Sequence, residues 1–330
     1  MKKRRLLQSG KLVSEIGLGC MSFAGFYGPT DEKEAHNTLN TALDYGIDFL
    51  DTANIYGMGV SETMIGNYIK NNGNPFVIAT KASISRDPET NERTFDNSSQ
   101  HLETELNKSL ERLGVDNVDL FYIHRRDPRI PIEDVMETLL KFKKEGKIGG
   151  IGFSEISPSS LRRASEVGLV DAIQSEYSLW TRSAELGLIQ TCQELEVSFI
   201  PFSPLGRGIF STTPPDPSTF GKLDFRKNNP RFLQPNFNEN LNLLAPFKQL
   251  CAELGVSPST MAIAWTLKQG EHMLPIPGTR SRNHLIELAL GSEFELTEEI
   301  SDQIDHLLPI GWAHGERYSD DQWIGIEKFC

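Results

Sequence analysis

The strongest constraint on the fold is a regular alternation of short, apolar, β-rich segments with longer helical patterns, which runs through most of the 330 residues. Eight such segments occur, at residues 16–21, 49–51, 76–81, 118–124, 148–154, 171–175, 198–203 and 273–278. Most of them lack a polar face, which is typical of parallel strands that are covered on both sides. The alternation predicts an α/β fold, and a closed (β/α)8 TIM barrel is its simplest form. An open doubly wound sheet is the alternative, although no GxGxxG motif follows the first segment.

The predicted helices show as apolar stripes between these segments. Apolar residues at positions 132, 135, 136, 139 and 140 repeat at helical spacing behind Pro131, a residue that suits the first turn of a helix. Leucines at positions 102, 106, 110 and 113 form a second stripe. We expect Asn97 to cap the helix that carries the second stripe.

Two segments stand outside the alternation. Residues 7–15 contain a turn-like Ser-Gly pair between short β-like stretches, which predicts an N-terminal β-hairpin that caps the barrel floor. Residues 206–238 are rich in Gly, Pro, Asn and Thr, which predicts a long loop after the seventh strand, above the active-site face. Because no repeat or linker divides the sequence, we expect one barrel domain over residues 1–330.

Composition narrows the function. The net charge of −12 argues against a nucleic-acid partner. The longest apolar runs are shorter than the roughly 18 residues that indicate a membrane span, and the basic start MKKRRLL is not followed by the apolar core of a signal peptide. The cysteines (Cys20, Cys192, Cys251 and Cys330) are widely spaced, which is typical of reduced thiols and not of a metal site. These features predict a cytoplasmic protein.

Polar residues stand where the second, third and fourth predicted strands end. Asp51, Lys81 and His124 hold these positions, and Tyr56 follows Asp51 closely. Taken one at a time, each is more often a helix cap, a solvated charge or a structural side chain than a catalytic group. Active sites of α/β barrels lie at the carboxyl ends of the strands, so we expect the four side chains to converge.

At these residues the sequence resembles the aldo-keto reductase superfamily, over nearly all of the chain. The matching motifs are DTANIYG (51–57), IATK (78–81), LFYIH (120–124), GFSE (152–155), AIQSEY (172–177), PFSPLGRG (201–208) and IPGTR (276–280). The stretches DFRKNNPRF (224–232) and GERY (315–318) look like the bacterial, fungal and plant branch that reduces assorted aldehydes. The resemblance implies reduction of an aldehyde or ketone with NAD(P)H.

The resemblance also assigns roles to the four polar residues. Tyr56 would be the general acid, and the ammonium of Lys81 would lower the pKa of the Tyr56 phenol. Asp51 would pair with Lys81, and His124 would orient the carbonyl oxygen of the substrate. No metal is required, because Tyr56 and His124 polarise the carbonyl.

Carried over in the same way, further residues would bind the cofactor. They are Ser154 and Gln174 for the nicotinamide carboxamide, Phe202 for the nicotinamide ring, Ser203, Leu205, Gly206 and Gly208 for the pyrophosphate, Met21 and Ser22 for the ribose, Thr279 and Arg280 for the 2′-phosphate, and Glu287 for the adenine region. Packing in the barrel core is an equal interpretation for Phe202. His284 and Leu288 stand where relatives often carry Arg and Asn, and Glu155 stands where many carry Asn. NADPH is favoured because Thr279 and Arg280 would meet its 2′-phosphate. NADH remains possible because the departures at His284 and Leu288 would weaken the adenine and phosphate contacts.

The substrate pocket is the least defined part. Phe23, Tyr27 and Trp180 would form an aromatic wall beside Tyr56, or simply pack in the core. A set of four residues (Arg125, Arg126, Arg317 and Tyr318) would favour an anionic substrate, or would lie in surface ion pairs. The partner predicted by this reading is a small carbonyl compound, bound by a monomer or a weak homo-oligomer.

Two other functions stay open at this stage. One is a redox-sensing regulatory subunit of the same fold, which binds the cofactor without turnover. The other is an unrelated barrel enzyme such as a phosphosugar isomerase.

Overall fold

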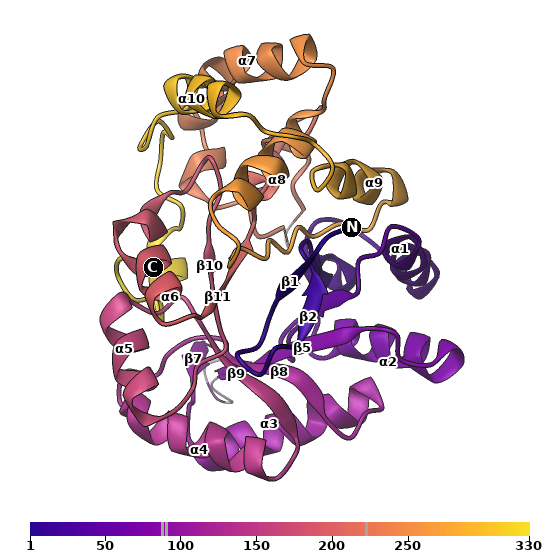
Figure 1. Ribbon diagram of the computed structural model, residues 1–330, viewed down its shortest axis with the longest axis vertical. Coiled ribbons are helices and arrows are strands. Elements are labelled where there is room, and N and C mark those ends of the chain that lie inside the picture. The colour runs from indigo at the N-terminus through magenta and orange to yellow at the C-terminus, as the bar shows by residue number, and fades with distance from the viewer. Residues whose placement is uncertain (87–88, 90–91, 222–223) are drawn as a thin grey trace.

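A ring of parallel strands, surrounded by helices, forms the centre of the molecule (Figure 1). The computed structural model of the chain describes residues 1–86, 89, 92–221 and 224–330. The seven strands of the sheet follow the order β11-β10-β9-β8-β5-β4-β3. Their bounds are β3 (Leu18–Gly19), β4 (Phe49–Asp51), β5 (Val77–Ala82), β8 (Val118–Ile123), β9 (Ile148–Ser154), β10 (Ala172–Glu176) and β11 (Ser198–Phe202). These strands correspond to the first seven predicted segments, with ends that shift by a few residues.

The eighth predicted segment closes the ring without being a regular strand. The amide nitrogens of Leu274 and Ile276 donate to the carbonyl oxygens of Phe199 and Pro201 in β11, at 2.9 and 3.0 Å. On the other side, Pro275 and Pro277 accept hydrogen bonds from Gly17 and Gly19, at 2.9 and 3.0 Å. The prolines have no N–H to return, so this edge has half a ladder and is not a strand. The prediction of eight strands is corrected to seven strands and one extended closing segment.

Helices cover the outside of the ring, as the apolar stripes predict (Figure 1). The bounds of the α-helices are α1 (Glu32–Asp44), α2 (Val60–Asn72), α3 (Ser99–Leu113), α4 (Ile132–Lys144), α5 (Pro158–Val167), α6 (Leu188–Glu194), α7 (Asn236–Glu253), α8 (Pro258–Lys268), α9 (Arg282–Leu290), α10 (Glu298–Leu307) and α11 (Asp320–Trp323). The 3-10 helices are η1 (Cys20–Ala24), η2 (Ser183–Leu186), η3 (Gly206–Gly208), η4 (Pro217–Thr219) and η5 (Pro230–Phe232).

Two predicted helix starts need correction. The cap of α3 is Ser98, whose hydroxyl accepts from the amide of His101 at 3.3 Å. Asn97 is buried instead, and its side chain bonds to the backbone of Arg125 and Asp127. Pro131 is the residue just before α4, and the helix begins at Ile132.

The N-terminal hairpin is present and lies across one end of the ring (Figure 1). Its strands, β1 (Lys3–Arg5) and β2 (Leu12–Ser14), are antiparallel, so the hairpin starts four residues before the predicted residue 7. The start was missed because β1 is basic. Arg4 donates to the carbonyl oxygens of Gly270 and Met273, at 2.7 and 3.0 Å, and so anchors the hairpin to the closing segment. Leu6 and Leu7 pack into the bottom of the barrel interior against a cluster that includes Phe49.

The segment after β11 is long but has local structure. It contains η3, η4 and η5, and α7 begins at Asn236, inside the predicted loop of residues 206–238. Residues 222 and 223 of that loop lie outside the described residues. A second hairpin, β6 (Ile84–Arg86) and β7 (Arg93–Phe95), follows β5 and was not predicted.

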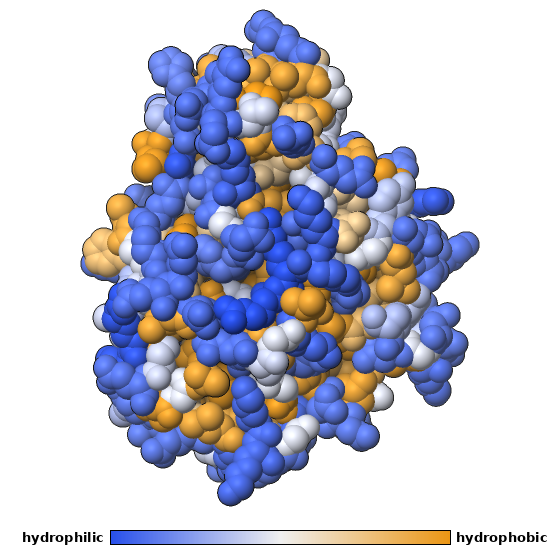
Figure 2. Space-filling model, viewed as in Figure 1, coloured by the Kyte–Doolittle hydropathy of each residue, from blue (hydrophilic) through white to orange (hydrophobic). Residues whose placement is uncertain are grey.

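The face seen in Figure 2 is mainly hydrophilic, with apolar residues in scattered patches. Among the described residues, no helix is both long and apolar enough to cross a membrane. All four cysteines are buried and none forms a disulfide.

The packing of the N-terminal hairpin into the bottom of the barrel as a plug leads to a prediction about stability. Leu6 is fully buried, whereas Leu12 of the same hairpin is 57% exposed. We expect Leu6→Ala to lower the free energy of unfolding by about 2–5 kcal/mol, because the substitution leaves a cavity at the barrel floor. Leu12→Ala is the matched control, with an expected change within about 0.5 kcal/mol. Urea unfolding followed by circular dichroism measures both, and equal losses would contradict the assignment of Leu6 as a plug.

Candidate active site

A buried ion pair lies at the carboxyl ends of β4 and β5. Lys81 is 0% exposed and Asp51 is 2% exposed. The Lys81 ammonium donates to Asp51 Oδ1 and, at 2.7 Å, to the carbonyl oxygen of Thr52. Asp51 Oδ2 accepts from Gln174 Nε2 at 2.8 Å, which connects the pair to β10. Burial raises the pKa of Asp51 and lowers the pKa of Lys81, and the attraction between the two charges opposes both shifts.

Tyr56 and His124 lie beside this pair. Lys81 Nζ is 5.2 Å from the centroid of the Tyr56 ring. The rings of Tyr56 and His124 meet edge to face, with centroids 5.8 Å apart. The structure therefore brings together the four side chains that the sequence predicted to converge.

The pKa of Tyr56 differs from the expectation. Burial and then the Asp51 carboxylate raise the pKa of the Tyr56 phenol above its usual value. The predicted lowering of this pKa by Lys81 is outweighed by burial and by the Asp51 carboxylate. As a consequence the phenol carries its proton throughout the neutral range, as a proton donor must.

His124 is held in its neutral form. Burial, followed by the positive charges of Arg125, Lys81 and Arg93, lowers the pKa of the His124 imidazole well below its usual value. His124 Nδ1 is buried and has no hydrogen-bond partner among the described residues. A neutral imidazole beside a phenol can donate a hydrogen bond to a bound oxygen without adding a charge.

Sequence reasoning did not single out Tyr122, which forms one wall beside Lys81. Lys81 Nζ is 5.7 Å from the centroid of the fully buried Tyr122 ring. The ring lies against Gly152 of β9, where an added Cβ would stand 2.4 Å from Tyr122 Cδ1. The glycine is therefore required by the ring. The motif LFYIH contains this tyrosine directly before Ile123 and His124. The signal that could have identified it is its place opposite Lys81 when the two strands pair in parallel.

Most of the predicted cofactor residues lie at the same ends of the strands. Ser154 ends β9 and pairs with Gln174 of β10 in the sheet register, and Phe202 ends β11. Phe202 is half-buried and packs against the barrel-interior cluster. This contact agrees with the packing interpretation and leaves part of the ring exposed.

The turn after β11 has an unusual backbone. Ser203, Gly206 and Gly208 have φ angles of 52°, 54° and 101°. At Gly206 there is no room for a side chain, since an added Cβ would lie 2.9 Å from the Trp180 ring. Leu205, between them, is half-buried.

The first and last segments of the barrel meet at the other predicted cofactor residues. Ser22 Oγ donates to the carbonyl oxygen of Thr279 at 3.0 Å, and Met21 precedes Ser22 in η1. Arg280 donates to the carbonyl oxygen of Tyr27 at 2.8 Å and lies 3.8 Å from a Glu34 carboxylate oxygen.

Glu287 is engaged elsewhere. One of its carboxylate oxygens accepts from Ser259 Oγ of α8 at 2.8 Å, and its carbonyl oxygen accepts from Thr260 at 2.9 Å. These bonds tie α9 to the start of α8, so the side chain has a structural partner in this structure.

The predicted aromatic wall is largely core. Phe23 is 0% exposed and belongs to the main hydrophobic core. Trp180 is also buried and stacks on Trp312, with centroids 6.3 Å apart. Packing is therefore the correct interpretation for these residues. Tyr27 is half-buried, and the guanidinium carbon of Arg226 is 5.0 Å from its ring centroid.

The four residues of the anionic-substrate hypothesis separate into two groups. Arg317 pairs with Glu155 at 2.8 Å and with Glu176 at 3.5 Å, and its guanidinium carbon lies 4.9 Å from the ring centroid of Tyr318. Arg126 lies 3.5 Å from a Glu327 oxygen. The ion pairs of Arg317 are buried, and that of Arg126 is partly buried. The sequence interpretation had placed such pairs on the surface. Arg125 differs, because its guanidinium meets no carboxylate in the described part of the chain.

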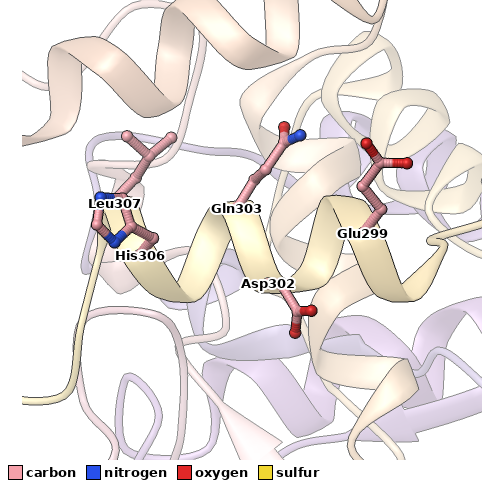
Figure 3. Close-up of a pocket in the computed structure, with 5 residues that line it drawn as sticks. All are labelled: Glu299, Asp302, Gln303, His306 and Leu307. Atoms are coloured by element: carbon pink, nitrogen blue, oxygen red, sulfur yellow. The ribbon is translucent and has the colours of Figure 1, made fainter.

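One hollow lies away from these residues. It runs along α10, has a volume of about 650 Å³, and is lined by Glu299, Asp302, Gln303, His306 and Leu307 (Figure 3). All of them belong to one outer helix. The hollow contains no predicted site residue, and it does not bear on the chemistry at the strand ends.

Comparisons with known proteins show the family and the fold of the chain. The family model described as "Aldo/keto reductase family" matches residues 15–309. The chain belongs to the aldo/keto reductase family. An aldo-keto reductase named yakc, with NADP(+) in its name, from Schizosaccharomyces pombe is 36% identical, over 93% of this chain and 92% of that protein. Aldo-keto reductase str7 from Strobilurus tenacellus is 37% identical, over 90% of this chain and 88% of that protein.

A solved structure gives the same result for the fold. The glycerol dehydrogenase AKR11B4 from Gluconobacter oxydans superposes with a TM-score of 0.84 and 28% identity, over 93% of this chain and 94% of that one. The aldo/keto reductase barrel is thus confirmed. As a member of the family, the chain is an oxidoreductase that acts on carbonyl compounds.

The buried neutral imidazole predicts a pH dependence of stability. The unfolded chain binds a proton at His124 below about pH 6.5, whereas the folded protein, with its lowered pKa, does not. The stability of the fold is therefore complete above that pH and decreases as the pH falls below it. We expect His124→Gln to lose about 1 kcal/mol less unfolding free energy than the wild type between about pH 7.5 and about pH 5.5.

Urea unfolding at the two pH values measures this difference. His306→Gln, at an exposed position on α10, is the matched control and should keep the wild-type dependence. A pH dependence identical in the His124→Gln variant and the wild type would show that the imidazole is not buried in its neutral form.

Proposed function

We propose that this aldo/keto reductase reduces an aldehyde or ketone to an alcohol with NADPH, and that Tyr56 is the general acid. The observation that carries the proposal is the meeting of the Tyr56 phenol, the neutral His124 and the Lys81–Asp51 ion pair at one end of the barrel. The name of the yakc relative, which includes NADP(+), supports the choice of cofactor.

Each side chain contributes a separate part of the chemistry. A bound reduced nicotinamide supplies the hydride to the carbonyl carbon. Tyr56 and His124 donate hydrogen bonds to the carbonyl oxygen, where negative charge develops, and Tyr56 then transfers its proton to that oxygen. The Lys81 ammonium, held by Asp51, stabilises the phenolate that remains. The Tyr122 ring and the neighbouring strands keep Lys81 away from water.

The residues present fit a dinucleotide phosphate. Phe202 offers a partly exposed ring at the end of β11, and Ser154 and Gln174 stand beside each other on neighbouring strands. Arg280 is partly exposed, with a side-chain exposure of 30%, and a guanidinium offers paired donors to a phosphate. Ser203, Gly206 and Gly208 have positive φ angles, and the two glycines would let a pyrophosphate approach the backbone of this turn closely. Met21, Ser22, Leu205, Thr279 and Glu287 complete the proposed cofactor set.

The proposal also covers the domain organisation, the oligomeric state and the cellular setting of the enzyme. We assign the whole chain to one catalytic domain that works as a monomer or a weak homo-oligomer. The four unpaired cysteines support a reducing, cytoplasmic setting. Turnover of a generic aldehyde separates this enzyme from a redox-sensing subunit that binds the cofactor without reducing a substrate.

The role of Tyr56 is tested by removing its hydroxyl. We expect Tyr56→Phe to lower kcat by about 100- to 10,000-fold, because proton donation is lost, while NADPH binding is retained. NADPH oxidation at 340 nm and NADPH fluorescence titration measure the two properties. Tyr45→Phe, in the turn after α1, is the control and should keep wild-type turnover. Normal turnover by Tyr56→Phe would exclude Tyr56 as the acid.

The preference for the phosphorylated cofactor is tested at Arg280. We expect Arg280→Ala to raise the KM for NADPH by about tenfold or more and to change the KM for NADH little, because only NADPH carries the 2′-phosphate. Arg282→Ala, at an exposed position two residues later, should leave both values unchanged. Equal increases for the two cofactors in the Arg280 variant would assign the phosphate to another residue.

A further inference from the structure

Arg125 is a buried cation without a counter-charge in the described part of the chain. It follows His124 directly and is 8% exposed. Its Nη1 donates to the carbonyl oxygen of His124 at 2.6 Å and to Ser154 Oγ at 3.0 Å. Its Nε is buried and has no hydrogen-bond partner among the described residues. Both acceptors of Nη1 are neutral, so the charge itself is not compensated by them.

The backbone holds Arg125 at a fixed place. Ser83 Oγ donates to the Arg125 carbonyl oxygen at 2.9 Å and accepts from the Arg125 amide at 2.9 Å. Asn97 Nδ2 donates to the same carbonyl oxygen at 3.1 Å. The polar residue that was expected to cap α3 thus serves to position Arg125.

Neighbouring arginines have found partners. Arg126, which is 7% exposed, has a counter-charge 3.5 Å away in Glu327, although its Nε and Nη1, like the Nε of Arg125, have no hydrogen-bond partner among the described residues. Arg317 pairs with Glu155 and Glu176. Arg207 donates to Glu176 at 2.9 Å. Among the described residues, the carboxylates of Glu155, Glu176 and Glu327 are therefore directed to arginines other than Arg125, and that of Asp51 is directed to Lys81.

The other titratable groups around His124 do not compensate the charge of Arg125. The Lys81–Asp51 pair is neutral as a whole, and the pKa shift of His124 keeps the imidazole uncharged. Arg93 of β7 lies within the field of Arg125, and burial, followed by Arg125, lowers the pKa of Arg93 to about 10. A buried, unpaired charge is costly, and an anionic ligand would remove that cost.

We propose that Arg125 binds an anionic group on the substrate, so that the preferred substrates are carbonyl compounds that carry a carboxylate or a phosphate near the reacting carbonyl. Arg125 is joined to His124, which orients the carbonyl oxygen, and its guanidinium would form charge-assisted hydrogen bonds with either anion. This inference rests on the proposed reductase function and specifies its substrate class.

The test compares charged and neutral substrates of matched shape in the full-length enzyme with NADPH. For the carboxylate, 4-carboxybenzaldehyde is compared with 4-formylbenzamide. For the phosphate, glyceraldehyde 3-phosphate is compared with glyceraldehyde. The readout is the ratio of kcat/KM for the charged member to that for the neutral member. The ratio does not depend on how much of a variant is folded or loaded with cofactor.

We expect a wild-type ratio above about 10 for at least one pair, and a fall of about 10- to 100-fold in Arg125→Gln. The pair with the larger ratio identifies the anion. Arg125→Lys keeps the charge without the fork and should retain part of the ratio. Arg126→Gln is the matched control, because Arg126 is equally buried and adjacent but is paired with Glu327, and its ratio should equal that of the wild type.

A binding measurement separates this inference from the proposed function. Benzoate and benzamide, which cannot be reduced, are titrated into the enzyme–NADPH complex by calorimetry. Tighter binding of benzoate that is lost in Arg125→Gln supports the anion site even without turnover. Reduction of neutral aldehydes with no advantage for the charged ones, or a ratio unchanged in Arg125→Gln, overturns the anion site and leaves the reductase function intact.

Discussion

The organisation of the barrel mouth depends on the buried ion pair between Lys81 and Asp51. The pair joins β4 to β5, and Gln174 extends it across to β10. Removing one member of such a pair leaves a bare charge in the interior, at a cost of about 3–5 kcal/mol. Because Tyr56 and His124 lie against this pair, the same interaction that holds the strand ends together also sets the electrostatic environment of the proposed acid.

A second group of buried charges fixes the segments that cover the mouth. Arg207, in the segment after β11, and Arg317, near the C-terminus, both reach Glu176 at the end of β10. Arg317 also pairs with Glu155, which directly follows Ser154. The covering segments are thus attached to the two strands that carry Ser154 and Gln174. A shift of either segment would disturb the proposed nicotinamide site, although the segments lie far apart in the sequence.

Much of this arrangement follows from the sequence, because strand ends in a parallel barrel meet at one edge. That rule was enough to bring together Asp51, Lys81 and His124 from their positions alone. It could not show which side chains compensate each other. The pKa of Tyr56 was expected to fall, and it rises because the phenol is buried and lies near the Asp51 carboxylate. Equally, nothing in the sequence distinguishes Arg125 from Arg126, since the difference lies in a contact with Glu327 almost at the end of the chain.

The closing segment, residues 273–278, joins the first strand of the barrel differently from the last. Pro275 and Pro277 receive hydrogen bonds from Gly17 and Gly19 and return none, while on the β11 side Leu274 and Ile276 donate from their own amides. The junction between the first and last segments therefore has fewer main-chain hydrogen bonds than a regular parallel ladder. Just beyond this junction, the hydroxyl of Ser22 donates a hydrogen bond to the carbonyl oxygen of Thr279. A long ligand bound across this junction would contact both the first and the last segment, and would so add to the few main-chain hydrogen bonds that hold them together.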